Sequence, residues 1–139
     1  MSNEFLLVDD DSDDTELFCE ALNEIDHSVH CHFALDGEEA LSLLQEIKPN
    51  VIFLDINMPG MNGWDCLSLL KSNEESKNIP VIMYSTSSHK TEVEKAFNMG
   101  ALSFFSKPSD YKELKAMLQD VVDRVNNGTL ESLARTFKK

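Results

Sequence analysis

The chain has 139 residues, 42% of them hydrophobic, and this size suits one compact domain with a buried core. Its 12 lysines and arginines stand against 25 aspartates and glutamates, a formal net charge of −13. Such a charge opposes binding to nucleic acid or to an anionic membrane, so we expect neither partner. The sequence lacks the basic flank of a signal peptide and any apolar run of about 20 residues, so we expect a cytoplasmic protein.

Short apolar runs alternate along the chain with stretches of helical periodicity. The predicted strands cover residues 5–8, 29–34, 51–54, 80–85 and 102–105. The predicted helices cover residues 12–25, 36–47, 64–73, 88–100 and 109–127. Five such units predict an α/β fold with a parallel sheet covered on both faces, and right-handed crossovers favour a doubly wound sheet.

Capping residues set the expected ends of these helices. Ser12 and Asp36 are the predicted N-caps of the first two helices, and Gly100 ends the fourth. The inner face of the first helix is predicted to carry Leu17, Ala21, Leu22 and Ile25. We expect one domain over residues 1–127 with no output domain after it. Residues 128–139 form a tail that could extend the last helix or pack separately.

Three cysteines, Cys19, Cys31 and Cys66, are widely spaced and form no CxxC pair. This usage predicts reduced thiols in a reducing compartment, mostly packed as small core residues. Cys31 lies between two histidines, but on a strand His30 and His32 point to the face opposite Cys31. The donors do not converge, so we predict no metal site there.

Polar side chains follow four of the five predicted strands, at the point where each strand ends. They are Asp9, Asp10, Asp11, Asp55, Asn57, Ser85, Thr86 and Lys107. In a doubly wound sheet, ligands bind outside the carboxyl ends of the strands, so we expect these side chains to converge. Close carboxylates repel one another unless a cation lies among them, and oxygen ligands of this kind suit Mg²⁺.

The same residue types suit phosphoryl transfer to a carboxylate. A carboxylate such as Asp55 can act as a nucleophile toward phosphorus. Mg²⁺ and the Lys107 ammonium would neutralise the phosphoryl oxygens, and the Ser85 hydroxyl could hydrogen-bond the attached group. The pattern therefore indicates a site that makes and holds an aspartyl phosphate.

Four segments stand in a characteristic order on these elements. They are "LLVDDD" (6–11), "LDINMPGMNG" (54–63), "VIMYST" (81–86) and "FFSKP" (104–108). With them, residues 4–125 resemble the receiver domain of the response regulators of two-component signalling. The resemblance implies a flavodoxin-like, CheY-like fold, with a five-stranded parallel sheet of order 2-1-3-4-5 and five helices.

The resemblance also implies roles for residues at the site. Asp55 matches the phosphoacceptor, and Lys107 matches the lysine that contacts the phosphoryl group, with the bond to Pro108 in the cis form. Asp10 matches a direct Mg²⁺ ligand, and Asp9 matches a ligand that acts partly through water.

Further matched positions concern the metal, the switch and the phosphoryl lifetime. Asn57 would supply its backbone carbonyl to the metal. Ser85 matches the switch hydroxyl, and Phe104 matches the switch aromatic, which moves inward as the hydroxyl turns toward the phosphate. Asn57, Thr86 and Ser87 match positions that tune access to the phosphoryl group and its loss.

The implied function is a phosphorylation-activated switch rather than an enzyme. A histidine kinase or histidine phosphotransfer protein would donate the group. A downstream protein would bind the surface formed by the fourth helix, fifth strand and fifth helix. A receiver-shaped scaffold that works without phosphorylation is the alternative. An aspartate-nucleophile phosphatase is disfavoured because it needs Asp-x-Asp, and Asn57 cannot serve as its acid and base.

Overall fold

Strands and helices alternate along the chain in the computed structural model, which describes residues 3–87, 89–134 and 136–138. The strands are β1 (Glu4–Val8), β2 (His30–Ala34), β3 (Val51–Leu54), β4 (Val81–Ser85), β5 (Ser103–Ser106) and β6 (Thr136–Lys138). The helices are α1 (Ser12–Ile25), α2 (Gly37–Leu43), α3 (Gly63–Ser72), α4 (Lys90–Asn98), α5 (Tyr111–Asn127) and the short 3-10 helix η1 (Leu130–Leu133). The predicted alternation is confirmed, although α2 ends at Leu43 rather than at residue 47.

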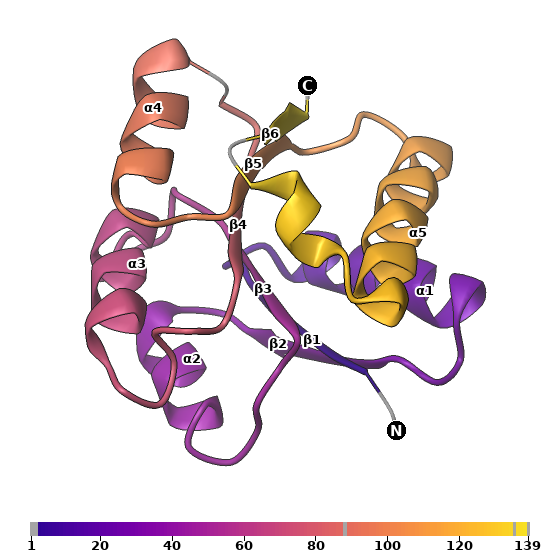
Figure 1. The fold of residues 1–139 in the computed structure, drawn as a ribbon, viewed down its shortest axis with the longest axis horizontal. Helices are drawn as coiled ribbons and strands as arrows, with labels where there is room; N and C mark the ends of the chain where they lie inside the picture. Colours follow the sequence, from indigo (N-terminus) through magenta and orange to yellow (C-terminus); the bar gives the residue numbers. More distant parts are fainter. Residues whose placement is uncertain (1–2, 88, 135, 139) are drawn as a thin grey trace.

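The strands form one parallel sheet in the order β2-β1-β3-β4-β5-β6. The first five strands confirm the predicted order 2-1-3-4-5. Helices α2, α3 and α4 cover one face of the sheet, and α1 and α5 cover the other (Figure 1). Successive strand residues point to opposite faces, so Leu6 and Val8 pack in one core while Phe5 and Leu7 pack in the other. Because both faces are covered, the inner strands β1 and β3 contain continuous apolar runs, at residues 5–8 and 51–54.

The C-terminal segment adds a sixth strand, β6, beside the five strands whose predicted order is confirmed, whereas the sequence suggests only that the tail extends the last helix or packs separately. Gly128 ends α5 in the left-handed conformation, with φ of +70°. Leu130 and Leu133 of η1 are then buried on the face that α1 and α5 cover. Residues 136–138 pair in parallel with β5. A strand of three residues is too short to show a periodic pattern in sequence.

Helix α1 begins with a different cap from the predicted one. The Asp11 carboxylate accepts hydrogen bonds from the backbone N–H groups of Asp13 (2.9 Å) and Asp14 (3.2 Å). Asp11 is therefore the N-cap, and Ser12 is the first helical residue, so the prediction of a Ser12 cap is wrong. The Asp9 carboxylate accepts the N–H of Asp11 at 3.0 Å, which ties the cap to the end of β1.

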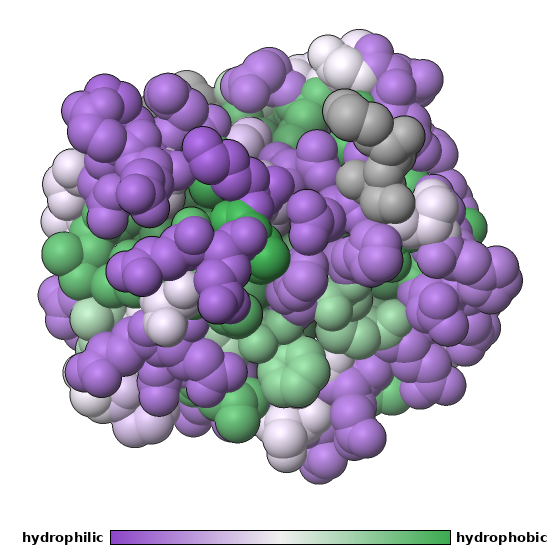
Figure 2. Space-filling model, turned by 90° about the horizontal axis from the view of Figure 1, so that it is seen from below, coloured by the Kyte–Doolittle hydropathy of each residue, from purple (hydrophilic) through white to green (hydrophobic). Residues whose placement is uncertain are grey.

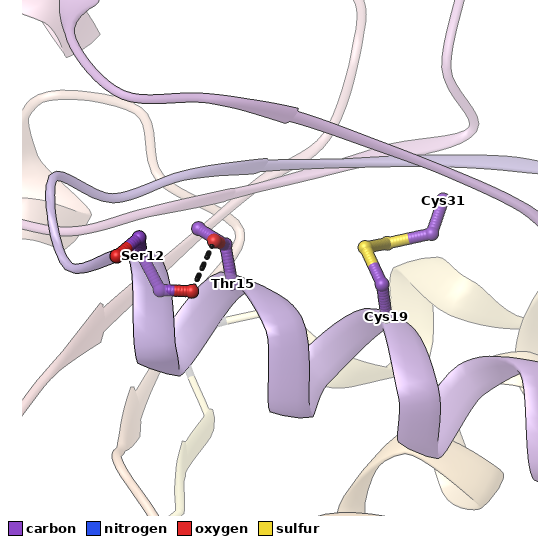
Figure 3. Close-up of a disulfide and its surroundings, with 4 residues drawn as sticks. All are labelled: Ser12, Thr15, Cys19 and Cys31. Carbon is purple, nitrogen blue, oxygen red and sulfur yellow. Dashed lines mark hydrogen bonds between the residues drawn. A yellow bond between two sulfur atoms is a disulfide. The ribbon is translucent and has the colours of Figure 1, made fainter.

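Cys19 of α1 and Cys31 of β2 form a disulfide, with 5.5 Å between their Cα atoms (Figure 3). The prediction of reduced thiols is wrong for this pair, whereas Cys66 is free and buried as predicted. Thr15, one turn before Cys19, donates its hydroxyl hydrogen bond to the Ser12 carbonyl oxygen at 2.9 Å. The two cysteines approach each other only because the fold places α1 against β2, so their spacing in the sequence does not predict the disulfide. The cysteines therefore give no support to a reducing compartment.

Loss of this disulfide is expected to lower the free energy of unfolding by about 2–3 kcal/mol, because the bond restricts the unfolded chain. The test is denaturant unfolding of the wild-type chain with and without reductant. A Cys19→Ser/Cys31→Ser variant serves as the control that should not respond to reductant. Thiol titration of the unfolded, unreduced chain should find one free thiol, that of Cys66. Three titratable thiols would contradict the disulfide.

Polar side chains cover most of the face that Figure 2 shows, and hydrophobic ones lie between them in smaller patches. The exposed large hydrophobic residues include Leu17, at 46%, so the prediction that Leu17 faces the core is wrong. Phe18 is buried instead and packs on the sheet with Ala21 and Leu22. None of the helices within residues 3–87 and 89–134 combines the length and apolar composition of a membrane span.

Candidate functional site

Three carboxylates meet at the carboxyl ends of β1 and β3. Asp9 and Asp10 follow β1, and Asp55 follows β3. Each residue offers one carboxylate oxygen, and these oxygens lie within 4.8 Å of one another. Asp9 is 0% exposed and Asp55 is 5% exposed, whereas Asp10 is exposed to solvent. The structure thus brings together acidic residues from two segments that are distant in sequence.

The Lys107 ammonium lies among these carboxylates. Its Nζ atom is 2.7 Å from Oδ2 of Asp9 and 3.0 Å from Oδ2 of Asp14. The distance from Nζ to Oδ2 of Asp55 is longer, at 3.9 Å. The Lys107 side chain is only 12% exposed, so these interactions are poorly screened by solvent. The predicted convergence of Lys107 with the acidic residues is therefore present.

The backbone at Lys107 differs from the expectation. Its N–H donates a hydrogen bond to the Ser85 carbonyl oxygen at 2.9 Å, which continues the pairing of β4 with β5. The bond between Lys107 and Pro108, both in the described part of the chain, is trans, so the prediction of a cis bond is wrong. The trans form of a bond before proline is favoured by about 0.5–1 kcal/mol, and Lys107 reaches the carboxylates in that form.

Burial and neighbouring charges shift the pKa values at the site. Burial raises the pKa of Asp55 to about 6, an effect that Lys107 opposes and Asp9 reinforces. Burial also raises the pKa of Asp9, against the hydrogen bonds from Lys107 and the Asp11 N–H. Burial disfavours the charge on Lys107, yet its hydrogen bonds to Asp9 and Asp14 outweigh burial and raise its pKa to about 12. One ammonium faces several carboxylates, so the site favours a further cation.

The loop after β3 holds Asp55 in place. The backbone N–H of Asn57 donates a hydrogen bond to the Asp55 carboxylate, and the Asn57 side chain is exposed. The loop closes where the N–H of Gly63 donates to the Ile56 carbonyl oxygen at 2.8 Å. A Cβ atom at Gly63 would lie 2.2 Å from the Asp55 carbonyl oxygen, so only glycine lets α3 begin this close to Asp55.

The predicted switch and lifetime residues lie around the end of β4. Ser85 is 0% exposed, and its Oγ atom accepts a hydrogen bond from the Ser87 N–H at 3.1 Å. The Ser87 hydroxyl donates to the Glu92 carboxylate of α4. Thr86 is exposed, whereas Phe104 of β5 is 0% exposed in the core under α2, α3 and α4. Ser85 and Ser87 are thus linked through hydrogen bonds to α4.

The acidic residues fit a divalent metal ion, because carboxylate oxygens are the donors that hard cations take. The two oxygens of Asp9 already accept hydrogen bonds, one from the Asp11 N–H and one from Lys107.

Sequence reasoning missed two residues that contact Lys107. Asp14 forms an ion pair with it, and the ring centroid of Tyr84 lies 5.6 Å from its Nζ atom. An acidic residue in the first turn of a helix is ordinary, so Asp14 gave no sign of a partner 93 residues away. Tyr84 lies within the apolar run of β4, where it reads as a core residue.

Comparison with known proteins places this architecture in a family. The response regulator receiver domain family matches residues 5–119. Response regulator Rcp1 of Synechocystis is 31% identical over 125 residues, which cover 84% of this chain and 84% of Rcp1. A protein-glutamate methylesterase/protein-glutamine glutaminase of Methanococcoides burtonii is 32% identical over 124 residues. The match covers 88% of this chain but 34% of that relative, and the chain spans 26% to 63% of several others.

Solved structures agree with these matches. The Mn²⁺-bound form of response regulator Rcp1 has a TM-score of 0.75 and 28% sequence identity to this chain. The similarity covers 86% of this chain and 91% of that structure. A family match over most of the residues, with the sheet order and the acidic cluster at its carboxyl edge, shows that the chain belongs to the response regulator receiver domain family.

Proposed function

We propose that the chain is a cytoplasmic phosphorylation switch of two-component signalling that accepts a phosphoryl group on Asp55. The observation that carries this proposal is the buried Asp55 carboxylate, held beside Asp9, Asp10 and the Lys107 ammonium. The donor is a histidine kinase or a histidine phosphotransfer protein. Residues 1–127 act as the receiver domain, and residues 128–139 are an appended segment.

The chemistry is a displacement at phosphorus by a carboxylate oxygen. At neutral pH the Asp55 carboxylate is ionised, since its pKa is about 6. It forms a P–O bond as the bond between phosphorus and the donor histidine nitrogen breaks, and the released imidazole takes up a proton. The Lys107 ammonium stabilises the charge on the phosphoryl oxygens, and the Ser85 hydroxyl donates to the attached group.

The cation that we propose for this site is Mg²⁺, held by Asp10, Asp55 and the backbone carbonyl of Asn57, with Asp9 acting partly through water. When bound, it supplies positive charge that reduces repulsion between the carboxylates and the incoming phosphoryl group. The Mn²⁺-bound structure of Rcp1 supports a divalent cation in a relative.

The output is a change in protein contact. Ser85 turns toward the phosphorylated Asp55, Phe104 repacks, and the surface of α4, β5 and α5 changes for a downstream protein. The hydrogen bonds from Ser85 through Ser87 to Glu92 of α4 support a link between the site and this surface. Asn57, Thr86 and Ser87 set the lifetime of the phosphoryl group.

The test is incubation of the chain with acetyl phosphate, with and without Mg²⁺, followed by intact-mass measurement. We expect a Mg²⁺-dependent gain of one phosphoryl group in the wild-type chain and none in Asp55→Asn. Asp65→Asn, which removes an acidic residue from the exposed side of α3, is the matched control and should react as the wild type does. An equal gain in Asp55→Asn would refute the assignment. Partner binding that is equal before and after treatment would favour the scaffold alternative.

A further inference from the structure

The Lys107 ammonium lies farther from Asp55, the proposed phosphoryl acceptor, than from Asp9 and Asp14. Its Nζ atom makes hydrogen bonds to Asp9 at 2.7 Å and to Asp14 at 3.0 Å, but lies 3.9 Å from Asp55. The Tyr84 ring, 5.6 Å from Nζ, lies on the α1 and α5 side of the sheet. A phosphoryl group on Asp55 would therefore have to draw the ammonium from its present partners.

The two hydrogen-bonded partners differ in how easily they can release the ammonium. The Asp9 side chain is 0% exposed, so its carboxylate would be left buried and unpaired. The Asp14 side chain is 38% exposed, and water can hydrate its carboxylate once Lys107 has left. Asp14 is thus the partner that a phosphoryl group can replace at lower cost.

The position of Asp14 is set by the start of α1. Its backbone N–H donates to the Asp11 carboxylate at 3.2 Å, and Asp11 in turn donates its N–H to Asp9. A cavity of about 280 Å³ lined by Asp14, Tyr84 and Lys107, among others, lies beside the pair. The ion pair therefore joins the first turn of α1 to the loop after β5 at the edge of the site.

We propose that Asp14 is a positioning residue that competes with the phosphoryl group for the Lys107 ammonium and thereby restrains phosphorylation of Asp55. This inference rests on the proposed function and concerns its regulation. Removal of the Asp14 charge leaves Lys107 bonded to Asp9 but releases one of its N–H donors, which can contact the phosphoryl oxygens as charge develops on them. It leaves the residues proposed to bind the metal unchanged.

Asp13 provides a matched control for this inference. It is the neighbouring residue in the first turn of α1 and carries the same charge, and its N–H also donates to the capping Asp11 carboxylate, at 2.9 Å. The Asp13 side chain is exposed. Among the described residues, the ion-pair partners of Lys107 are Asp9, Asp14 and Asp55, and Asp13 is not one of them. Asp13→Asn therefore reproduces the change in net charge and helix dipole without the change at Lys107.

The experiment measures the initial rate of phosphorylation by acetyl phosphate with saturating Mg²⁺ for the wild-type chain, Asp14→Asn, Asp14→Glu and Asp13→Asn. We expect Asp14→Asn to react about 2- to 5-fold faster than Asp13→Asn, in line with the loss of one partly exposed ion pair. Asp14→Glu keeps the charge and should return the rate to that of the wild type. Far-ultraviolet circular dichroism verifies that each variant is folded.

The outcomes separate the two proposals. Equal rates in Asp14→Asn and Asp13→Asn, or a slower rate in Asp14→Asn, would overturn this inference and leave the proposed function standing. A wild-type chain that gains no phosphoryl group would overturn the proposed function and this inference together.

Discussion

Replacement of Lys107 with methionine is expected to lower the free energy of unfolding by about 3–5 kcal/mol near pH 8 in the absence of divalent cations. Methionine keeps the apolar part of the side chain but removes the ammonium that lies 2.7 Å from the fully buried Asp9. The Asp9 and Asp55 carboxylates would then be buried without a cation. Denaturant unfolding in the presence of a chelator measures the loss.

The loss in Lys107→Met should depend on pH. Burial already raises the pKa values of Asp9 and Asp55, and removal of the ammonium raises them further. At about pH 5 the Asp55 carboxyl, whose pKa is already about 6 in the wild type, is protonated, so the difference from the wild type should shrink there. The control is Lys115→Met, whose exposed pair with Glu24 is screened by solvent and should contribute little to stability. An equally small loss in Lys107→Met would contradict the electrostatic account of the site.

Asp55→Asn is expected to have the opposite effect on stability. In the unfolded chain Asp55 titrates near 3.8, and burial raises its folded-state pKa to about 6. Folding therefore favours the protonated carboxyl. The native state carries no electrostatic penalty from Asp55 in acid, and it becomes less stable as the pH rises through about 6 and the buried carboxyl ionises. A shift of this size corresponds to about 3 kcal/mol near pH 8. The metal-free asparagine variant should be more stable than the wild type by about that amount.

The pH profile distinguishes this effect from a simple gain in packing. The advantage of Asp55→Asn should decrease steadily as the pH falls toward about 4, because the wild-type carboxyl then becomes neutral. Added Mg²⁺ should stabilise the wild-type chain more than the variant, since the variant lacks a proposed ligand. An advantage that does not change between about pH 4 and pH 8, or a loss of stability near pH 8, would contradict the raised pKa.

The features that sequence could predict are those that the parallel sheet itself determines. Asp9, Asp55 and Lys107 each follow a buried strand, and the carboxyl ends of parallel strands share one edge. Their convergence therefore follows once the strands are identified. The order of the first five strands came from the family resemblance, and the structure confirms it.

The features that sequence could not predict depend on contacts between elements. Helix α1 begins at Ser12, with the Asp11 carboxylate as its N-cap, and this start places Asp14 in the first turn, where it forms an ion pair with Lys107. The disulfide of Cys19 and Cys31 requires α1 to pack on β2 so that these two residues lie directly opposite each other. Strand β6 is three residues long and is defined by its pairing with β5, so neither periodicity nor composition marks it.

The most direct test of the central claim is to locate the phosphoryl group on the chain. After reaction with acetyl phosphate and Mg²⁺, borohydride reduces an aspartyl phosphate to the alcohol, and tandem mass spectrometry of the peptides identifies the converted residue. We expect conversion of Asp55 to homoserine, with Asp9 and Asp10 unchanged. Conversion at another residue, or none in a chain whose intact mass shows a phosphoryl group, would contradict it.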